Sequence, residues 1–228
     1  MAELPKATEP FKFCTRLHLR ELTGLRASNL KQLVSLIKTV PGSSIYHHTH
    51  HFLQQHQYLS PEPPNDFAYW VSQVLGEERL GERLAAIDTI QYSTIRALRE
   101  RIIETIEDYL NSHSTANLKF ASEGEEFHFI RSISFVLPTP YEAHDLQEFV
   151  DALKKVTIDS IYFHIFESRL RLEKETNDIS NWIEGCLGEK ELADEIANLD
   201  PYTYTLEGLR ENIISLIEGR IKNITDSG

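Results

Sequence analysis

The sequence predicts a mainly α-helical protein: two homologous helical domains, about four helices each with a short N-terminal strand, packed as a pseudo-twofold dimer. Two observations predict this fold class. The chain repeats itself with a period of about 115 residues, and apolar residues recur at helical spacing through most of each repeat. With 228 residues the chain is long enough for two domains of ordinary size.

The repeat appears when "DLQEFVDALKKVTIDSIYFHIF" (145–166) is aligned with "NLKQLVSLIKTVPGSSIYHHTH" (29–50), an offset of 116. Both segments contain the block Ser-Ile-Tyr, and His48 matches His164. A shared series of this length and order indicates a tandem duplication.

A second match lies farther along, where "NDFAYWVSQVLGEERL" (65–80) aligns with "NDISNWIEGCLGEKEL" (177–192). We therefore expect two domains, residues 1–114 and 115–228, joined within the polar stretch 111–126. Two homologous halves commonly pack about an approximate twofold axis, as the subunits of a homodimer do.

Each copy begins with a segment typical of a short strand, "FKFCTRLHL" and "FHFIRSISFVL". Amphipathic helices are expected to follow. In the first copy they cover residues 28–39, 43–58, 66–87 and 92–111.

Helix ends are predicted from residues that suit them. Ser28 or Asn29 can cap the first helix, and Asn65 or Asp66 the third, because their side chains accept bonds from free backbone N–H groups. Gly76 is expected to mark a helix end or kink.

Composition limits the function classes. A net charge of −12 argues against a nucleic-acid partner, since phosphate binding requires clustered Lys and Arg. No apolar stretch is long enough to span a membrane, and the start of the chain lacks the features of a signal peptide, so we expect a cytoplasmic protein. Two cysteines, Cys14 and Cys186, are too few for a disulfide framework.

The densest chemical signal is "PGSSIYHHTHHFLQQHQYL" (41–59), which contains five of the ten histidines. At the positions of His47 and His50 the second copy has Phe163 and Phe166. We therefore expect the first copy to hold imidazoles on a sheltered face. The second copy is more acidic and lacks this cluster, so we expect it to be degenerate.

One interpretation is a metal site. His47 and His51 are four residues apart, a spacing that places two imidazoles on one face of a helix. The candidate ligands are His47, His48, His50, His51, His56 and Glu77, and Tyr46 and Tyr58 are candidates for contacting a bound cofactor. Imidazole with carboxylate suits zinc, iron, manganese or nickel.

The other interpretation is that the histidines are structural and the protein is a non-enzymatic interaction or regulatory module, binding a protein partner or a polar small molecule. His48, which is retained as His164, fits an internal hydrogen-bond network. No catalytic residue can be assigned, because the chain has no glycine-rich phosphate loop and no GxSxG motif. Whether the protein is an enzyme stays open at this point.

The run "VPGSSIYHHTHHFLQQHQYLSPEPPNDFAYWVSQVLGE" resembles a bacterial family catalogued as a domain of unknown function. The resemblance is clearest in the first copy and weaker through the second. The resemblance implies a coherent fold and does not indicate an activity.

Overall fold

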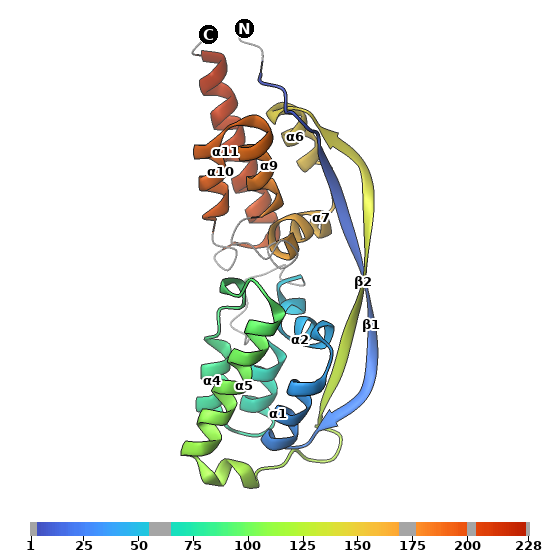
Figure 1. Ribbon diagram of the computed structural model, residues 1–228, viewed down its shortest axis with the longest axis vertical. Coiled ribbons are helices and arrows are strands. Elements are labelled where there is room, and N and C mark those ends of the chain that lie inside the picture. Colours follow the sequence, from blue (N-terminus) through green and yellow to red (C-terminus); the bar gives the residue numbers. More distant parts are fainter. Residues whose placement is uncertain (1–3, 55–64, 169–176, 200–203, 227–228) are drawn as a thin grey trace. The chain divides into compact units, whose positions relative to one another are not determined.

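The computed structural model describes residues 4–54, 65–168, 177–199 and 204–226 (Figure 1). Their contacts divide them into two compact units. The His48 unit comprises residues 18–54 and 65–134, and the His164 unit comprises the described residues up to 17 and from 135 onward. Each unit thus takes residues from both sides of the boundary expected at residue 114. None of the helices described is long and apolar enough to cross a bilayer.

The predicted fold class is wrong in its strands. β1 (Phe11–Ala27) and β2 (Phe127–Ala143) each extend over 17 residues and pair as a two-stranded sheet (Figure 1), where the sequence predicts short strands beside helices. Pro138 and Pro140 argue against a strand, but a strand with a single neighbour tolerates proline at its open edge. The tandem duplication and the pseudo-twofold dimer are not confirmed. The fold combines helices with this sheet.

Contacts between the strands show that they run antiparallel. His18 Nδ1 lies 2.9 Å from Ser134 Oγ, and the Glu21 carboxylate lies 2.7 Å from Arg131. Residue numbers therefore rise along β1 as they fall along β2, as the arrows in Figure 1 also show.

Helices in the His48 unit follow the expected segments. They are α1 (Leu30–Thr39), α2 (Gly42–Gln54), α3 (Asp66–Gln73), α4 (Glu78–Ala85) and α5 (Ile95–Ser112), with 3-10 turns η1 (Thr89–Gln91) and η2 (Ser114–Leu118). Asn29 and Asn65 cap α1 and α3, as predicted, by accepting bonds from the third backbone N–H beyond them. Gly76, at φ +62°, separates α3 from α4.

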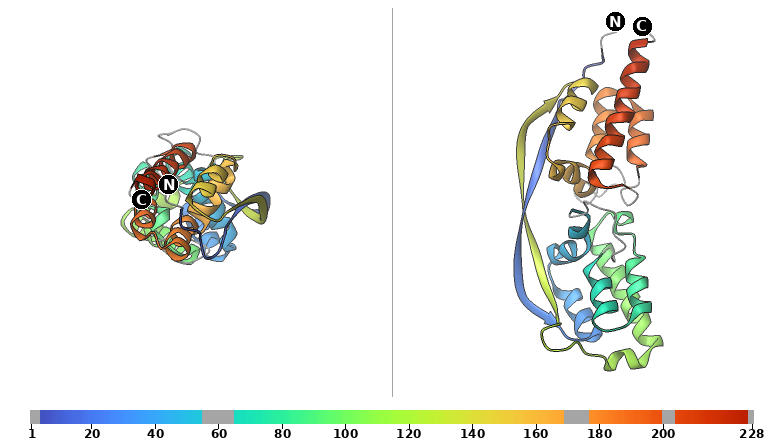
Figure 2. Two further views of the ribbon diagram at one scale, coloured as in Figure 1. Left: turned by 90° about the horizontal axis from the view of Figure 1, so that it is seen from above. Right: turned by 180° about the vertical axis from the view of Figure 1, so that it is seen from behind.

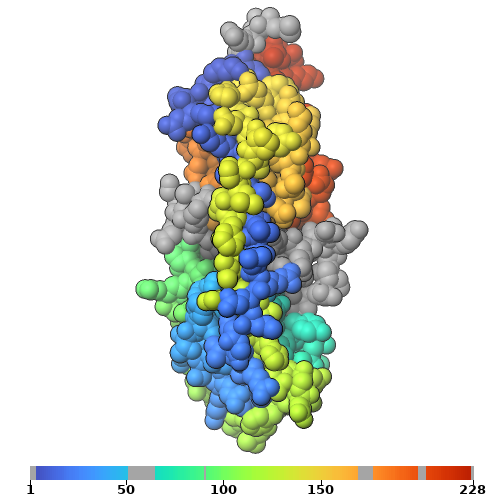
Figure 3. Space-filling view, turned by 90° about the vertical axis from the view of Figure 1, so that its right-hand side faces the viewer, coloured from blue at the N-terminus to red at the C-terminus, as the bar shows by residue number. Residues whose placement is uncertain are grey.

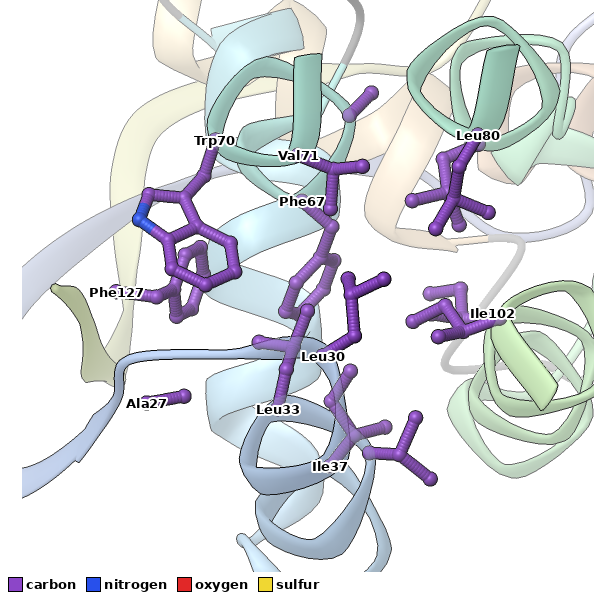
Figure 4. Packing of buried hydrophobic residues seen from close by; sticks show 14 of the residues in the cluster. Ala27, Leu30, Leu33, Ile37, Phe67, Trp70, Val71, Leu80, Ile102 and Phe127 are labelled. Atoms are coloured by element: carbon purple, nitrogen blue, oxygen red, sulfur yellow. The ribbon is translucent and has the colours of Figure 1, made fainter. Parts of the chain in front are cut away.

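The core of the His48 unit joins these helices to the start of β2 (Figure 4). The Phe127 and Phe67 rings stack with centroids 5.1 Å apart, and Phe129 is fully buried. Trp70 is 5% exposed, and its Nε1 donates to the Glu125 carbonyl at 2.7 Å. The first residues of β2 are therefore part of this core.

Helices in the His164 unit are α6 (Leu146–Leu153), α7 (Ile158–Tyr162), α9 (Asp178–Leu187), α10 (Lys190–Ala197) and α11 (Leu206–Asp226), with a π-helical turn η3 (Phe163–Glu167). Figures 1 and 2 show α9, α10 and α11 alongside one another. The core of the His164 unit includes the start of β1. The ring centroid of Phe11 lies 5.1 Å from that of Phe149 and 5.5 Å from that of Trp182.

Candidate histidine site

Helix α2 places three of the candidate ligands inside the His48 unit. His47, His48 and His50 are each only 3% exposed, which agrees with a sheltered face. His56 and Tyr58 lie outside the described residues, and so does the side chain of His51. The site can therefore be built only from the first three histidines and their neighbours.

His48 uses both of its ring nitrogens. Its Nε2 accepts the Ile130 N–H of β2 at 3.0 Å, and its Nδ1 lies 2.8 Å from the Asp66 carboxylate at the start of α3. A nitrogen that accepts an N–H carries no proton, so Nδ1 holds the proton and donates it to Asp66. The imidazole is neutral, and it joins β2 to α3.

The same arrangement surrounds His164 in the other unit. Its Nε2 accepts the Cys14 N–H of β1 at 2.9 Å, and its Nδ1 lies 2.9 Å from Asp178 at the start of α9. Ser160 Oγ donates to the Cys14 carbonyl at 2.7 Å. These two histidines therefore attach each strand to helices through its backbone.

His47 and His50 of α2 have polar or aromatic partners of their own. His47 Nδ1 lies 2.9 Å from Ser132 Oγ of β2, and His50 Nδ1 lies 2.8 Å from Thr49 Oγ1. Tyr46, a predicted cofactor contact, stacks on His50 with ring centroids 5.1 Å apart and an interplanar angle of 9°. Each of these rings has a polar or aromatic neighbour of its own.

One group of these residues could hold a metal ion. Ligand atoms of His47, His48 and Asp66 all lie within 4.8 Å of one another. Two imidazoles and a carboxylate form a donor set that several divalent metals accept. Asp66 has no sequence signal as a ligand, because an Asn-Asp pair just before a helical segment is typical of a helix cap. Asn65 alone performs that role, which leaves Asp66 to face His48.

Glu77 has a different environment from the one predicted. Tyr109 Oη donates to its carboxylate at 2.5 Å, and Lys119 Nζ lies 3.0 Å from it. Burial tends to raise the pKa of Glu77, but these two hydrogen bonds outweigh it and hold the pKa below its ordinary value. Burial, and then the bond to Glu77, raise the pKa of Tyr109 to about 12. The described partners of Glu77 are thus not histidines of α2.

The described residues of the His48 unit also form an open cleft of about 560 Å³ between the end of α4 and α5. None of the predicted site residues lines it. Its charged lining residues are Arg83, Asp88, Arg101 and Asp108. No histidine of α2 lines the cleft.

A model described as a family of unknown function, DUF5752, matches residues 8–218. The chain belongs to this family. The predicted resemblance to a family of unknown function is therefore confirmed. The DUF5752 match covers both units, so the two histidine arrangements lie within one family domain.

Among solved structures, that of OrfY from Thermoproteus tenax is similar to this DUF5752 protein, with a TM-score of 0.78 and 27% sequence identity. The alignment covers 95% of this chain and 98% of that chain. A comparison with curated proteins finds no match. These relationships support the fold and assign no activity.

Proposed function

We propose that this protein is a non-enzymatic interaction or regulatory module in which the described histidines are structural. The proposal rests on the exposure of large apolar side chains along the two strands. Of twelve large hydrophobic side chains that are exposed among the described residues, eight lie on β1 or β2. Figure 3 shows both strands at the surface. Concentrated apolar exposure is typical of an interaction surface.

Each unit contributes part of this exposure. In the His48 unit the exposed strand residues are Leu19, Leu22, Leu25 and Ile133, and in the His164 unit they are Leu17, Phe135, Val136 and Leu137. Their exposed fractions range from 37% for Ile133 to 70% for Leu22. Burying a half-exposed side chain of this size contributes about 1 kcal/mol, so four of them favour a complex appreciably before the cost of association.

Site-specific photo-crosslinking in cells that make the protein tests this function. A photoreactive phenylalanine analogue replaces Leu22 or Phe135, and a matched variant carries it at Glu104, whose side chain on α5 is 64% exposed. We expect both strand positions to give an adduct of defined mass and the α5 position to give none. Absence of any strand-specific adduct would contradict the proposal.

A metal-binding function is the second candidate, and the close ligand atoms of His47, His48 and Asp66 favour it. Zinc, iron, manganese or nickel would suit these donors. A metal on Nδ1 of His48 would displace the proton shared with Asp66. A neutral imidazole carries one ring proton, and with a metal on Nδ1 that proton would be on Nε2. Nε2 could then no longer accept the Ile130 N–H. Metal binding at Nδ1 would therefore remove the hydrogen bond by which His48 holds Ile130 of β2.

Elemental analysis of protein purified without a histidine tag distinguishes the two functions. If the histidines are structural, the protein contains no stoichiometric metal, and a chelator leaves its melting temperature unchanged. One equivalent of metal that is lost in both His47→Ala and Asp66→Asn would establish the metal site. It would also contradict a purely structural role for His48.

A further inference from the structure

The cleft between α4 and α5 of the His48 unit has the size of a small-molecule site. Its volume of about 560 Å³ lies within the range of about 300–1,000 Å³ that is usual for ligand pockets. The two helices pack against each other (Figure 1), and the segment 86–92 after α4 contributes to one wall. The opposite wall is a single face of α5, because Arg101, Thr105 and Asp108 are spaced at four and three residues.

Two opposite charges lie at one end of the cleft without neutralising each other. The Arg83 guanidinium lies 5.7 Å from the centroid of the Tyr109 ring, and Asp108 directly precedes Tyr109 on α5. Both Arg83 and Asp108 line the cleft, and neither forms an ion pair with a residue that the structure describes. An α-amino acid carries an ammonium and a carboxylate on one carbon atom, so it can pair with both side chains at once.

A third charge lies farther along the same face of α5. Arg101 is seven residues before Asp108, a separation of about 10 Å along the helix axis. Its carboxylate neighbour is Glu104 at 3.9 Å, and the two side chains are 51% and 64% exposed, so this contact contributes little. The long Arg101 side chain is therefore available to a second carboxylate of a bound ligand.

A smaller cleft in the His164 unit shows the contrasting case, in which an arginine is already neutralised. It has a volume of about 300 Å³ and is lined by residues of α10 and α11. Arg220, which lines it, donates to both carboxylate oxygens of Glu189, at 2.8 and 3.1 Å. A ligand carboxylate would give Arg83 the kind of partner that Glu189 gives Arg220.

We propose that the cleft between α4 and α5 binds a free acidic α-amino acid, glutamate or aspartate. Arg83 binds the α-carboxylate, Asp108 binds the α-ammonium and Arg101 binds the side-chain carboxylate. Asp88 also lines the cleft but has an interaction of its own, so the available charges are two positive and one negative. They complement a ligand with two carboxylates and one ammonium, whereas Asp108 opposes a phosphate and the arginines oppose a polyamine.

This site is separate from the exposed strand residues. Among the described residues, none of β1 or β2 lines the cleft. The amino-acid site therefore goes beyond the proposed interaction function, and either one can fail without the other.

Isothermal titration calorimetry of the full chain with four compounds tests the site. We expect glutamate to bind with a Kd of about 100 μM. N-acetylglutamate lacks the ammonium, glutamate α-amide lacks the α-carboxylate, and glutamine lacks the side-chain carboxylate. Each should bind at least tenfold more weakly, because each leaves one charge of the cleft without its partner. Equal binding of the four compounds, or no binding of glutamate at about 10 mM, overturns the proposal.

Variants assign each charge to its part of the ligand. Arg83→Gln and Asp108→Asn should each weaken glutamate binding at least tenfold. Arg79→Gln is the matched control, since Arg79 is an exposed arginine of α4 that does not line the cleft, and it should change the Kd less than twofold. Thermal melting verifies that the variants fold. An effect of Arg79→Gln as large as that of Arg83→Gln overturns the proposal.

Arg101→Gln provides a test of specificity. It should reduce the affinity for glutamate to that for glutamine, and it should leave glutamine binding within twofold of wild type, because glutamine has no charge for Arg101 to bind. Equal weakening of both ligands would contradict the role of Arg101. The cross-linking result at Leu22 and Phe135 is independent of this outcome.

Discussion

At the scale of single residues, His48 shows how a neutral imidazole connects two parts of the backbone. It accepts from Ile130 and donates to Asp66, so it serves as acceptor and donor at once. A charged imidazole has two donors and no acceptor and would lose the Ile130 bond. The His48 unit therefore requires the tautomer that is protonated on Nδ1.

Replacing His48 with phenylalanine should lower the free energy of unfolding by about 2 kcal/mol, because a buried N–H loses its acceptor. Urea denaturation measures the loss. His144→Phe is the matched control, since the side chain of His144 is 53% exposed, and it should change stability by less than about 0.5 kcal/mol. In nitrogen-15 spectra, a His48 ring protonated on Nε2 would contradict this assignment.

Tyr109 and Glu77 form a second buried pair in which a hydroxyl supports a carboxylate. The raised pKa of Tyr109, about 12 against an ordinary 10.0, means that folding favours the neutral phenol. That contribution to stability is fully present below pH 10 and is lost as the pH rises toward 12.

Tyr109→Phe should therefore cost about 2 kcal/mol at neutral pH, because a hydrogen bond to a charged, buried group is removed. The difference in melting temperature between wild type and variant should narrow as the pH rises above 10. Tyr69→Phe, at a side chain that is 54% exposed, provides the control. A difference that stays constant up to pH 12 would show that ionisation of Tyr109 is not linked to folding.

At the scale of elements, Gly76 determines that α3 and α4 are two helices. Its φ of +62° belongs to the left-handed region, and Lys119 Nζ donates to its carbonyl at 3.0 Å. A residue with a Cβ is strained in that region. The break therefore depends on the backbone of this one glycine.

Gly76→Ala should destabilise the protein by about 1 kcal/mol. Gly219→Ala, inside α11 with nothing within 4 Å of the added Cβ, should stabilise it by about 0.5–1 kcal/mol, because alanine favours a helix. Paired thermal melts compare the two substitutions. If both changes shift the melting temperature in the same direction, the argument from φ is wrong.

Local signals predicted the helices and missed the extent of the strands. Asn29 and Asn65 begin helices because a cap needs only residues within its own turn. β1 and β2 lie 100 residues or more apart in sequence and are held partly by His48 and His164, and no local pattern contains that pairing. Apolar and polar residues alternate in part of β1, but Leu19 and Leu22 there are exposed, so this alternation does not mark a buried face along the whole strand.

At the scale of the whole molecule, each unit is completed by a strand from the other half of the chain. Phe127 and Phe129 enter the core of the His48 unit, and Phe11 packs in the His164 unit. Neither half of the sequence therefore contains one complete core.

Cutting the chain at Gly124 tests this organisation. Gly124 has a positive φ of 89° and open space around it. Each fragment should be unfolded or weakly folded alone, because it lacks buried phenylalanines whose loss costs about 3–5 kcal/mol each. Mixing the fragments should restore helical circular dichroism and cooperative melting. Independent cooperative folding of both fragments would instead support domains at residues 1–114 and 115–228.

The sequence alone determined the helices, their caps and the sheltered place of His47 and His50, because these follow from residues near one another along the chain and from the comparison of the two copies. Tertiary structure decided what the histidines contact. The nitrogens of His48 meet the backbone of Ile130 and the carboxylate of Asp66, and Glu77 meets Tyr109. Hydrogen-bond partners depend on which distant segments pack together, and spacing along one helix carries no information about them.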